Sequence, residues 1–307
     1  MRAWLSIATN QYEESARMRK YLKLNSVFTW CFLALTGAFV PIGVAVSATS
    51  AADSSAPDGR WAELAPNFFG DQEIVESSDV ISMEAPKRAL DAAIVPIVVY
   101  AEGDARQIRK VHLIVDKNPL PLAGVFNFSD ENRSAWQSFE TRIRINEYTH
   151  VRAVAELDDG TLHMTSKFVK AAGGCSAPAL SDMSAAMANA GKMKVLLDDI
   201  SSTDKVAASL PPEQRANAEA TIKIRHPNNS GMQFDQISRN YIPAFYVHSI
   251  VAELGGRELL NIETNFSMSE NPVVRFQFAN LAEADSFKVF AVDSKNNRYE
   301  HSVEPVM

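Results

Sequence analysis

The chain has 307 residues, of which 46% are hydrophobic and 22% are charged, a composition typical of a globular protein with room for about two domains. Its 30 basic and 37 acidic residues give a net charge of −7, so it lacks the overall basic character of a nucleic-acid-binding protein. The presence of only two cysteines, with 13 glycines and 14 prolines, excludes a disulfide-stapled miniprotein and a low-complexity chain.

Residues 1–48 have the pattern of an export signal peptide. A basic cluster ends at Lys23, and residues 26–48 carry no charge and contain a strongly apolar run. The segment ends in Val46-Ser47-Ala48, small residues that suit a signal peptidase. We expect cleavage after Ala48, which would remove Cys31; retention of the uncharged stretch as a membrane anchor is the alternative.

Residues 60–172 predict the first β-rich domain. Short runs alternate apolar with polar residues or are apolar throughout, and Pro96 indicates an edge strand or a bulge in the first of them. Asp158-Asp159-Gly160 predicts a hairpin turn. Regular short strands separated by turns favour an antiparallel sandwich, with strands expected at 93–100, 111–115, 125–128, 141–145, 151–155, 162–165 and 167–169.

Residues 173–215 predict a linker, and residues 216–307 predict a second β-rich domain. The linker is rich in Ala, Gly, Ser and Met, and we expect helical structure at roughly 180–200 before the break at Pro211-Pro212. Gly255-Gly256 and Asn296-Asn297 mark turns in the second domain. Its expected strands are 221–225, 245–247, 258–262, 273–278, 286–290 and 299–303.

The feature with chemical character is the tripeptide Gly173-Gly174-Cys175. Two glycines give the thiol a flexible attachment, so Gly173 and Gly174 are candidate hinge residues. A thiol with a pKa near ~8.5 is partly ionised at neutral pH and can form persulfides or mixed disulfides. A buried, unreactive cysteine beside a turn is the alternative on these residues alone, because the motif is short.

No other motif points to catalysis, a metal or a cofactor. The chain has no His-Glu-x-x-His, no glycine-rich phosphate loop and no Gly-x-Ser-x-Gly, and we expect no cofactor. Cys175 lacks the His and Met spacing of a blue-copper site. The histidines are scattered, at positions 112, 150, 163, 226, 248 and 301, so no metal site is predicted.

In the order of its motifs, the mature chain resembles a SoxY protein of periplasmic sulfur oxidation fused to a SoxZ protein. The SoxY-like motifs are Ala93–Ile97, Lys117–Leu122, Thr141–Ile145 and Gly173-Gly174-Cys175. The SoxZ-like motifs are Ile224–Pro227, Ser230–Met232, Tyr241–Ala244, Ser269–Pro272 and Phe276–Phe278. The most similar subgroup is the SoxYZ-like carrier associated with quinoprotein dehydrogenases.

The resemblance implies two immunoglobulin-like sandwiches that pair with each other in a periplasmic, non-enzymatic protein. In SoxY, a flexible arm ending in Gly-Gly-Cys-Gly-Gly carries sulfur intermediates covalently, and partner enzymes act on them. By position, Cys175 would be the attachment site and Gly173 and Gly174 its hinge. Two departures weaken the transfer of the cargo: Ser176-Ala177-Pro178 follows the thiol, and the arm continues into a second domain.

Two functions therefore remain as alternatives to be separated. The first is a carrier that holds a sulfur-containing intermediate on Cys175 and presents it to periplasmic sulfur-oxidising enzymes. The second is an accessory module that docks a quinoprotein dehydrogenase or its cytochrome without covalent cargo. An enzyme in its own right, such as a thiol transferase, is disfavoured because no His or second Cys lies near Cys175 in sequence. Carrier function predicts a mobile, water-accessible thiol, whereas a sulfur sealed in apolar packing with its glycines in β-ladders would favour the docking module.

Overall fold

The computed structural model describes residues 59–102, 108–133, 136–178, 182–199, 218–278 and 286–304. Strands make up 52% of it and helices 10%, which confirms the predicted mainly β fold. The predicted signal peptide, residues 1–48, lies outside the described residues. Within the described ranges, no helix is both long and apolar enough to cross a membrane.

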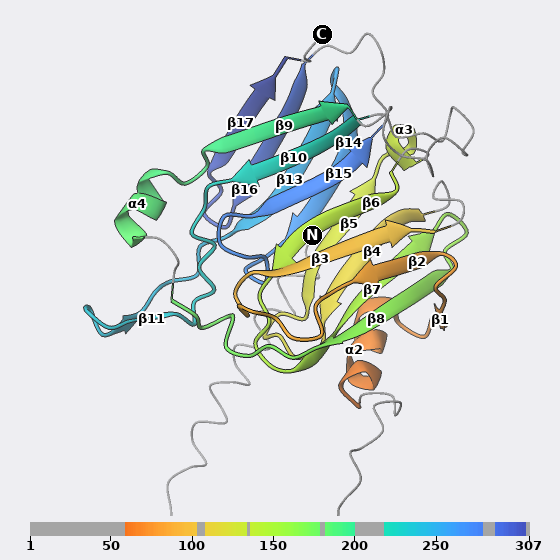
Figure 1. Ribbon diagram of the computed structural model, residues 1–307, viewed down its shortest axis with the longest axis horizontal. Coiled ribbons are helices and arrows are strands. Elements are labelled where there is room, and N and C mark those ends of the chain that lie inside the picture. The colour runs from red at the N-terminus through yellow and green to blue at the C-terminus, as the bar shows by residue number, and fades with distance from the viewer. Residues whose placement is uncertain are drawn as a thin grey trace, which may run out of the picture. The chain divides into compact units, whose positions relative to one another are not determined.

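Two large sheets form the body of the protein (Figure 1). The nine-stranded sheet has the order β1 (Ile74–Glu76), β8 (Leu162–Val169), β7 (Thr149–Leu157), β4 (Ile108–Val115), β5 (Leu122–Phe128), β14 (Arg257–Thr264), β13 (Val247–Leu254), β16 (Phe287–Asp293), β17 (Arg298–Val303). The six-stranded sheet has the order β2 (Ile81–Glu84), β3 (Val95–Ala101), β6 (Ser138–Ile143), β15 (Val273–Phe278), β10 (Ala218–Ile224), β9 (Met193–Asp199). The remaining described elements are α2 (Gly59–Phe69), α3 (Asp130–Arg133), α4 (Met183–Ala188), β11 (Phe234–Asp235) and β12 (Asn240–Tyr241).

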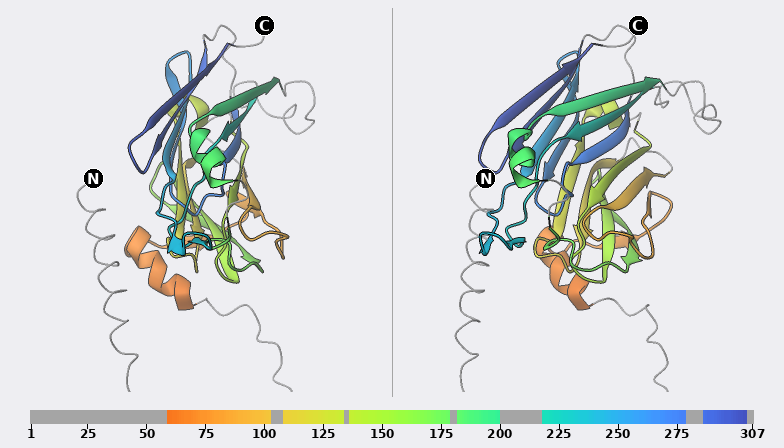
Figure 2. Two further views of the ribbon diagram at one scale, coloured as in Figure 1. Left: turned by 90° about the vertical axis from the view of Figure 1, so that its left-hand side faces the viewer. Right: turned by 60° about the vertical axis from the view of Figure 1, so that its left-hand side comes forward.

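The two β-rich halves are joined through both sheets. In the larger sheet β5 pairs antiparallel with β14, and in the smaller sheet β6 pairs antiparallel with β15. Figure 2 shows these two layers from the side, with strands of the first half (orange to green) continuing into those of the second (teal to blue). The backbones approach closely at the junction, where a side chain on Gly124 would meet the Glu263 carbonyl oxygen at 3.2 Å. Residues 55–307 accordingly form one compact unit.

A continuous hydrophobic core fills the space between the sheets. It draws on both halves, since Phe126 and Phe139 stack at 4.0 Å between ring centroids and belong to the same buried cluster as Phe276 and Phe287. The alternation of apolar and polar residues explains this layering, because successive side chains of a strand point to opposite faces. In β16, for example, buried positions alternate strictly with partly exposed ones. Burial of apolar surface between the sheets stabilises the two halves together.

Helix α2 covers part of the outer face of the nine-stranded sheet. Its Phe69 packs with Ile114 and Val154 in a second, smaller apolar cluster. The guanidinium of Arg152 lies 4.5 Å from the centroid of the Trp61 ring and pairs with the buried Asp116 at 2.9 Å. The helix thus covers the outer face of this sheet over strands β4, β7 and β8.

Several turns predicted from the sequence are present. Gly160 closes the β7–β8 hairpin with a φ of +85°, and Gly255 and Gly256 both have positive φ between β13 and β14. Asn296, with a φ of +63°, turns β16 into β17. Pro96 lies in β3 opposite Arg142 of β6, but β2 pairs only with residues 98–101 of β3. The proline therefore sits where the other neighbour has ended, so its missing N–H interrupts no ladder.

The linker prediction was correct for a short helix and wrong for residues 193–199. Asp182 caps α4 by accepting a hydrogen bond from the Ala185 N–H, as the sequence of a helix start requires. Residues 193–199, expected to be helical, form strand β9 at the edge of the six-stranded sheet, paired along its whole length with β10. Tertiary pairing with β10 overrides the local preference.

Candidate functional site: the cysteine loop

The cysteine loop, residues 170–178, follows strand β8 and crosses the junction between the two halves. Its start is anchored where the Lys170 N–H donates to the Lys87 carbonyl. Further along, the N–H groups of Gly173 and Gly174 donate to the carbonyls of Asn146 and Ile145, each at 2.9 Å. These bonds hold the loop against the segment that follows strand β6.

The two glycines occupy different environments. Gly173 is exposed, has a φ of +82°, and has open space where a side chain would extend. At Gly174 a Cβ atom would lie 2.0 Å from the Ala92 carbonyl oxygen and 2.8 Å from that of Ile145. A positive φ favours glycine at the first position, and close backbone approach requires it at the second. Both glycines are thus needed for this docked conformation, whatever they contribute to a hinge.

Cys175 is a free cysteine with no exposed surface. Its backbone is held from the other half of the protein, because the Ser230 hydroxyl donates to the Cys175 carbonyl. Burial raises the pKa of the thiol from 9.0 to about 11, and the charge of Arg144 opposes that rise. In this conformation the sulfur is an un-ionised thiol at neutral pH and has little nucleophilicity.

Arg144 is the charged group beside the thiol. Its side chain is buried, and Nη1 donates to the carbonyls of Phe266 at 3.1 Å, Met268 at 3.3 Å and Asn228. Burial lowers the pKa of the guanidinium, while the charges of Cys175 and Glu270 raise it. No carboxylate within the described ranges forms an ion pair with it, and its Nε is buried without a hydrogen-bond partner.

Two buried asparagines, one from each half, join the loops next to the cysteine loop by hydrogen bonds. Asn118 donates to the Arg144 carbonyl at 2.8 Å and to the Ser267 hydroxyl at 3.2 Å, and its Oδ1 accepts from the Asn146 N–H. Asn228 bridges the Met268 carbonyl and the Val247 N–H. Since each amide joins separate loops, these asparagines fix the position of Arg144 and of the backbone whose carbonyls accept hydrogen bonds from the two glycines.

The thiol is therefore less accessible than the sequence led us to expect. The predicted water-accessible tether is instead a docked loop, because hydrogen bonds to Asn146, Ile145 and Ser230 repay part of the entropy of ordering two glycines. The surroundings are nevertheless not purely apolar, and neither Gly173 nor Gly174 lies in a β-strand. The sulfur is buried in an irregular loop, with the charge of Arg144 near it.

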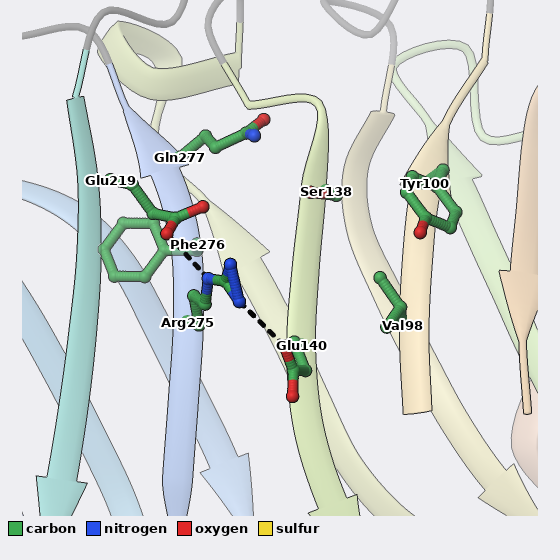
Figure 3. A pocket seen from close by; sticks show the side chains of 8 residues that line it. All are labelled: Val98, Tyr100, Ser138, Glu140, Glu219, Arg275, Phe276 and Gln277. Carbon is green, nitrogen blue, oxygen red and sulfur yellow. Dashed lines mark hydrogen bonds and ion pairs between the residues drawn. The ribbon is translucent and has the colours of Figure 1, made fainter. Parts of the chain in front are cut away.

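A shallow pocket on the outer face of the six-stranded sheet was not predicted. Arg275 of β15 lies between Glu219 of β10 and Glu140 of β6, with N–O distances of 2.6 Å and 3.2 Å (Figure 3). Tyr100 and Gln277 complete its rim (Figure 3). The two carboxylates exceed the charge of the arginine by one, so this pocket carries no unpaired cation.

The histidines do not assemble into a site. His226 is buried, with Nε2 3.8 Å from Asp293 Oδ2, and burial lowers its pKa to about 4 despite that carboxylate. His112 packs on Phe69 and lies 3.5 Å from Glu156. In the part of the chain that is described, no group of three His, Cys, Asp or Glu side chains could hold a metal ion.

Arg144, Ser230 and Gln233 are the polar residues around the thiol that sequence reasoning did not assign a role. Arg144 belongs to Thr141–Ile145, where strict alternation would expose it together with Arg142. Strand β6 ends at Ile143, so the alternation stops and Arg144 turns inward while Arg142 stays exposed. The Ser230 hydroxyl contacts Cys175, 55 residues away in sequence, and no local pattern identifies such a contact; Gln233 reaches the site through Ser230.

Comparisons with family models match both halves. Residues 65–175 match the model described as "Sulfur oxidation protein SoxY", and residues 210–304 match that described as "Sulphur oxidation protein SoxZ". The first match ends at the candidate thiol, Cys175. The second covers strands β10 to β17 and the loop that carries Ser230, whose hydroxyl donates to the Cys175 carbonyl.

Other comparisons add no functional information. No curated protein matches the chain. Among solved structures, superoxide reductase (neelaredoxin) from Ignicoccus hospitalis matches with 15% identity and a TM-score of 0.27, covering 30% of this chain and 80% of that one. A single-residue variant of the same enzyme gives the same identity and TM-score, covering 30% and 79%.

Proposed function

Because this chain is a SoxY domain fused to a SoxZ domain, we propose that it is a periplasmic carrier that holds a sulfur-containing intermediate covalently on Cys175. The two domains are sulfur-oxidation carrier domains, and their families are non-catalytic. Their pairing, intermolecular when the two are separate chains, is intramolecular here, which fixes the stoichiometry.

The observation that carries the proposal is the position of Cys175. It is the last residue of the SoxY match and follows the two glycines at the domain junction. The other cysteine of the sequence, Cys31, lies in the predicted signal peptide and would be removed on export. A mature protein with one thiol cannot lose it to an internal disulfide, so that thiol stays available for cargo.

Attachment of cargo requires the docked loop to open. A thiol with a pKa of about 11 is ionised to only ~10⁻⁴ at pH 7, against about 3% for an ordinary cysteine near ~8.5. Coupling thiosulfate to the thiol forms one S–S bond and releases one proton and two electrons. An electron-accepting partner, such as a cytochrome, has to take those electrons. We propose that such a partner releases the loop from Ile145 and Ser230 before the sulfur reacts.

Export supports the same function. Proteins of the Sox system are generally periplasmic. The predicted signal peptide would deliver this chain to that compartment, where sulfur-oxidising enzymes or a quinoprotein dehydrogenase and its cytochrome would be the partners. Gly173, exposed and in open space, would serve as the hinge of the released loop, and Gly174 would leave its close contact with Ala92.

Mass spectrometry of the intact protein, purified from its native compartment without reductant, tests the proposal. We expect adducts of sulfur and sulfur oxyanions that localise to Cys175 and disappear on treatment with a reductant. A Cys175→Ser variant from the same strain is the matched control and should carry none. Uniformly unmodified Cys175 in cells metabolising reduced sulfur compounds would contradict the carrier function.

The burial of the thiol favours a second candidate, an accessory module without covalent cargo. In this case the cysteine loop would serve to lock the two domains together, as Ser230 and Ile145 hold it. A strain with Cys175→Ser would then retain the activity of the quinoprotein dehydrogenase, whereas deletion of the whole gene would abolish it. Loss of activity in both strains would leave the carrier function as the explanation.

A further inference from the structure

Arg144 is a buried cation with spare hydrogen-bonding capacity. Only 2% of its surface is exposed, and the carbonyls of Asn228, Phe266 and Met268 accept only from Nη1. The Nε donor has no partner, and within the described ranges no carboxylate forms an ion pair with the guanidinium, although Glu270 is near enough to raise its pKa. Buried charges are normally paired, so this one lacks the contacting counter-ion that its environment calls for.

Gln233 offers a second unused donor in the same region. It is 1% exposed, and its Oε1 accepts from the Ser230 N–H at 2.9 Å and lies 3.2 Å from the Ser230 hydroxyl oxygen. The bond from the N–H fixes which end of the amide is the acceptor, and leaves Nε2 as a buried donor without a partner. A buried, unsatisfied donor reduces stability, and Nε2 is therefore free to bind an acceptor that enters this region.

Both side chains are tied to the backbone around Cys175. The Ser230 hydroxyl that contacts Gln233 also donates to the Cys175 carbonyl. Arg144 directly precedes Ile145, whose carbonyl accepts from the Gly174 N–H, and its charge acts on the Cys175 thiol. Each residue with an unused donor is therefore linked, through one neighbouring residue, to the backbone of the cysteine loop.

We infer that Arg144 and Gln233 form an anion-binding site beside Cys175, which takes the oxidised, negatively charged end of a group bound to its sulfur. The inference rests on the proposed function and specifies it further. A sulfonate or sulfinate oxygen would supply the missing counter-ion to Arg144 and the acceptor to Gln233, as charge-assisted hydrogen bonds favour. A neutral group of the same length would gain neither, so the site selects oxidised cargo.

The unloaded thiol does not use this cation itself. Burial outweighs the charge of Arg144 and keeps the sulfur protonated. The guanidinium therefore remains without a contacting anion until one arrives on the sulfur. A loaded side chain is longer, so Gly173 and Gly174 would move outward and release their bonds to Asn146 and Ile145 while the anionic end replaces them in holding the loop.

Two chemical adducts on the purified protein separate charge from size. Tetrathionate reacts with the thiolate as Cys175–S⁻ + ⁻O₃S–S–S–SO₃⁻ → Cys175–S–S–SO₃⁻ + S₂O₃²⁻, and gives an anionic thiosulfonate. Methyl methanethiosulfonate gives the neutral Cys175–S–S–CH₃ and releases methanesulfinate. Each adduct is then released with dithiothreitol, an uncharged reductant, and the rate is followed by intact mass.

Gln233→Glu is the sharpest variant for this test. It retains the oxygen that accepts from Ser230 and replaces the donor Nε2 by a negatively charged oxygen. We expect dithiothreitol to release the thiosulfonate adduct about tenfold faster or more from this variant than from the unmodified sequence, since a hydrogen bond to a charged group is lost. Release of the methylthio adduct should change by less than about twofold, within the range of altered packing alone.

Arg144→Lys retains the charge but loses the planar guanidinium, and should give the same anion-specific acceleration. Arg142→Gln, two residues away on the exposed face, is the matched control and should change neither rate. Thermal unfolding of each variant establishes that it is folded, and Gln233→Glu keeps the test decisive if Arg144→Lys does not fold.

Equal acceleration of both adducts would overturn the inference, because it would show that the two residues only fasten the loop. Unchanged release of the thiosulfonate from Gln233→Glu would overturn it as well. Either result leaves the carrier function standing, since that depends on adducts found on Cys175 in cells. Conversely, anion-specific release from a protein that carries no adduct in cells would refute the carrier function alone.

Discussion

Arg144 and Arg275 both lie at the junction between the SoxY and SoxZ domains, yet they have opposite surroundings. Arg275 has a side chain that is 46% exposed, and Glu140 and Glu219 flank it on the open face of the six-stranded sheet. Their hydrogen bonds and charges raise its pKa. Arg144 is buried among backbone carbonyls beside Cys175, and burial lowers its pKa.

The difference shows where this protein departs from ordinary pairing of its charges. A surface arginine with two carboxylates contributes little and needs no functional explanation. A buried arginine without a carboxylate in contact destabilises the fold unless another group compensates it. Ion pairing within the protein therefore accounts for the charge of Arg275 but not for that of Arg144, which lies beside the thiol.

We expect the largest effect from Gly174→Ala, which should expose the thiol of the cysteine loop. The added methyl group would lie 2.0 Å from the Ala92 carbonyl oxygen, so the loop has to leave its docked position. An exposed thiol with an ordinary pKa near ~8.5 is about 300 times more ionised at pH 7 than the docked one. We expect iodoacetamide to alkylate Cys175 faster by about that factor, as measured by intact mass. Gly173→Ala meets no clash but strains a φ of +82°, so it should accelerate alkylation by a smaller factor.

Replacement of Arg144 should have the next largest effect. Arg144→Met leaves the carbonyls of Phe266, Met268 and Asn228 without their buried donor, and we expect the free energy of unfolding to fall by about 3 kcal/mol in urea titrations. An equally stable or more stable Arg144→Met protein would mean that burying this charge costs as much as its hydrogen bonds contribute.

The pH dependence of stability tests how far burial disfavours the ionised form of the Cys175 thiol. The folded thiol has a pKa of about 11 and the unfolded one about 9.0, so the thiol favours the folded state below pH 9. As the pH rises from 9 to 11 the unfolded chain ionises first, and the wild type should lose about 2–3 kcal/mol relative to Cys175→Ala. The difference between the two unfolding free energies at each pH isolates this group from the lysines and tyrosines that titrate nearby.

The smallest effect is expected at Arg275. Arg275→Met breaks two partly exposed ion pairs, which should reduce stability by about 0.5 kcal/mol or less. High salt should reduce the stability of the wild type by a similar amount and leave the variant unchanged. A loss as large as that of Arg144→Met would remove the distinction between the two sites.

Much of the fold could be predicted because its strands carry their own pattern. In strand β7, polar and apolar residues alternate over His150–Ala153, and Gly160 forms the turn after the strand with the positive φ that glycine allows. Strand β9 could not be predicted, because Met193–Asp199 becomes a strand only by pairing with β10. The continuity of both sheets through β5–β14 and β6–β15 also depends on contacts between residues more than 100 positions apart.

The sequence singled out the cysteine of the loop, and its role as the attachment point stays a prediction. The sequence Gly173-Gly174-Cys175 identified the thiol by its chemistry, and the family matches are consistent with its position at the end of the SoxY domain. Its burial was not predictable, because it depends on the exact space beside Ala92 and on the Ser230 hydroxyl from the other domain. The burial of Arg144 was not predictable either, because strand β6 ends one residue before it and the alternation of side chains stops there.

The continuous pairing of strands across the junction has a consequence for turnover. In a heterodimer of separate proteins, a subunit with an irreversibly oxidised thiol can be exchanged for an intact one. Here β5–β14 and β6–β15 join the two domains as neighbours within shared sheets, and the chain also connects them covalently. If Cys175 carries the cargo, over-oxidation of this one sulfur to the sulfonic acid inactivates both domains at once, and the whole chain has to be replaced.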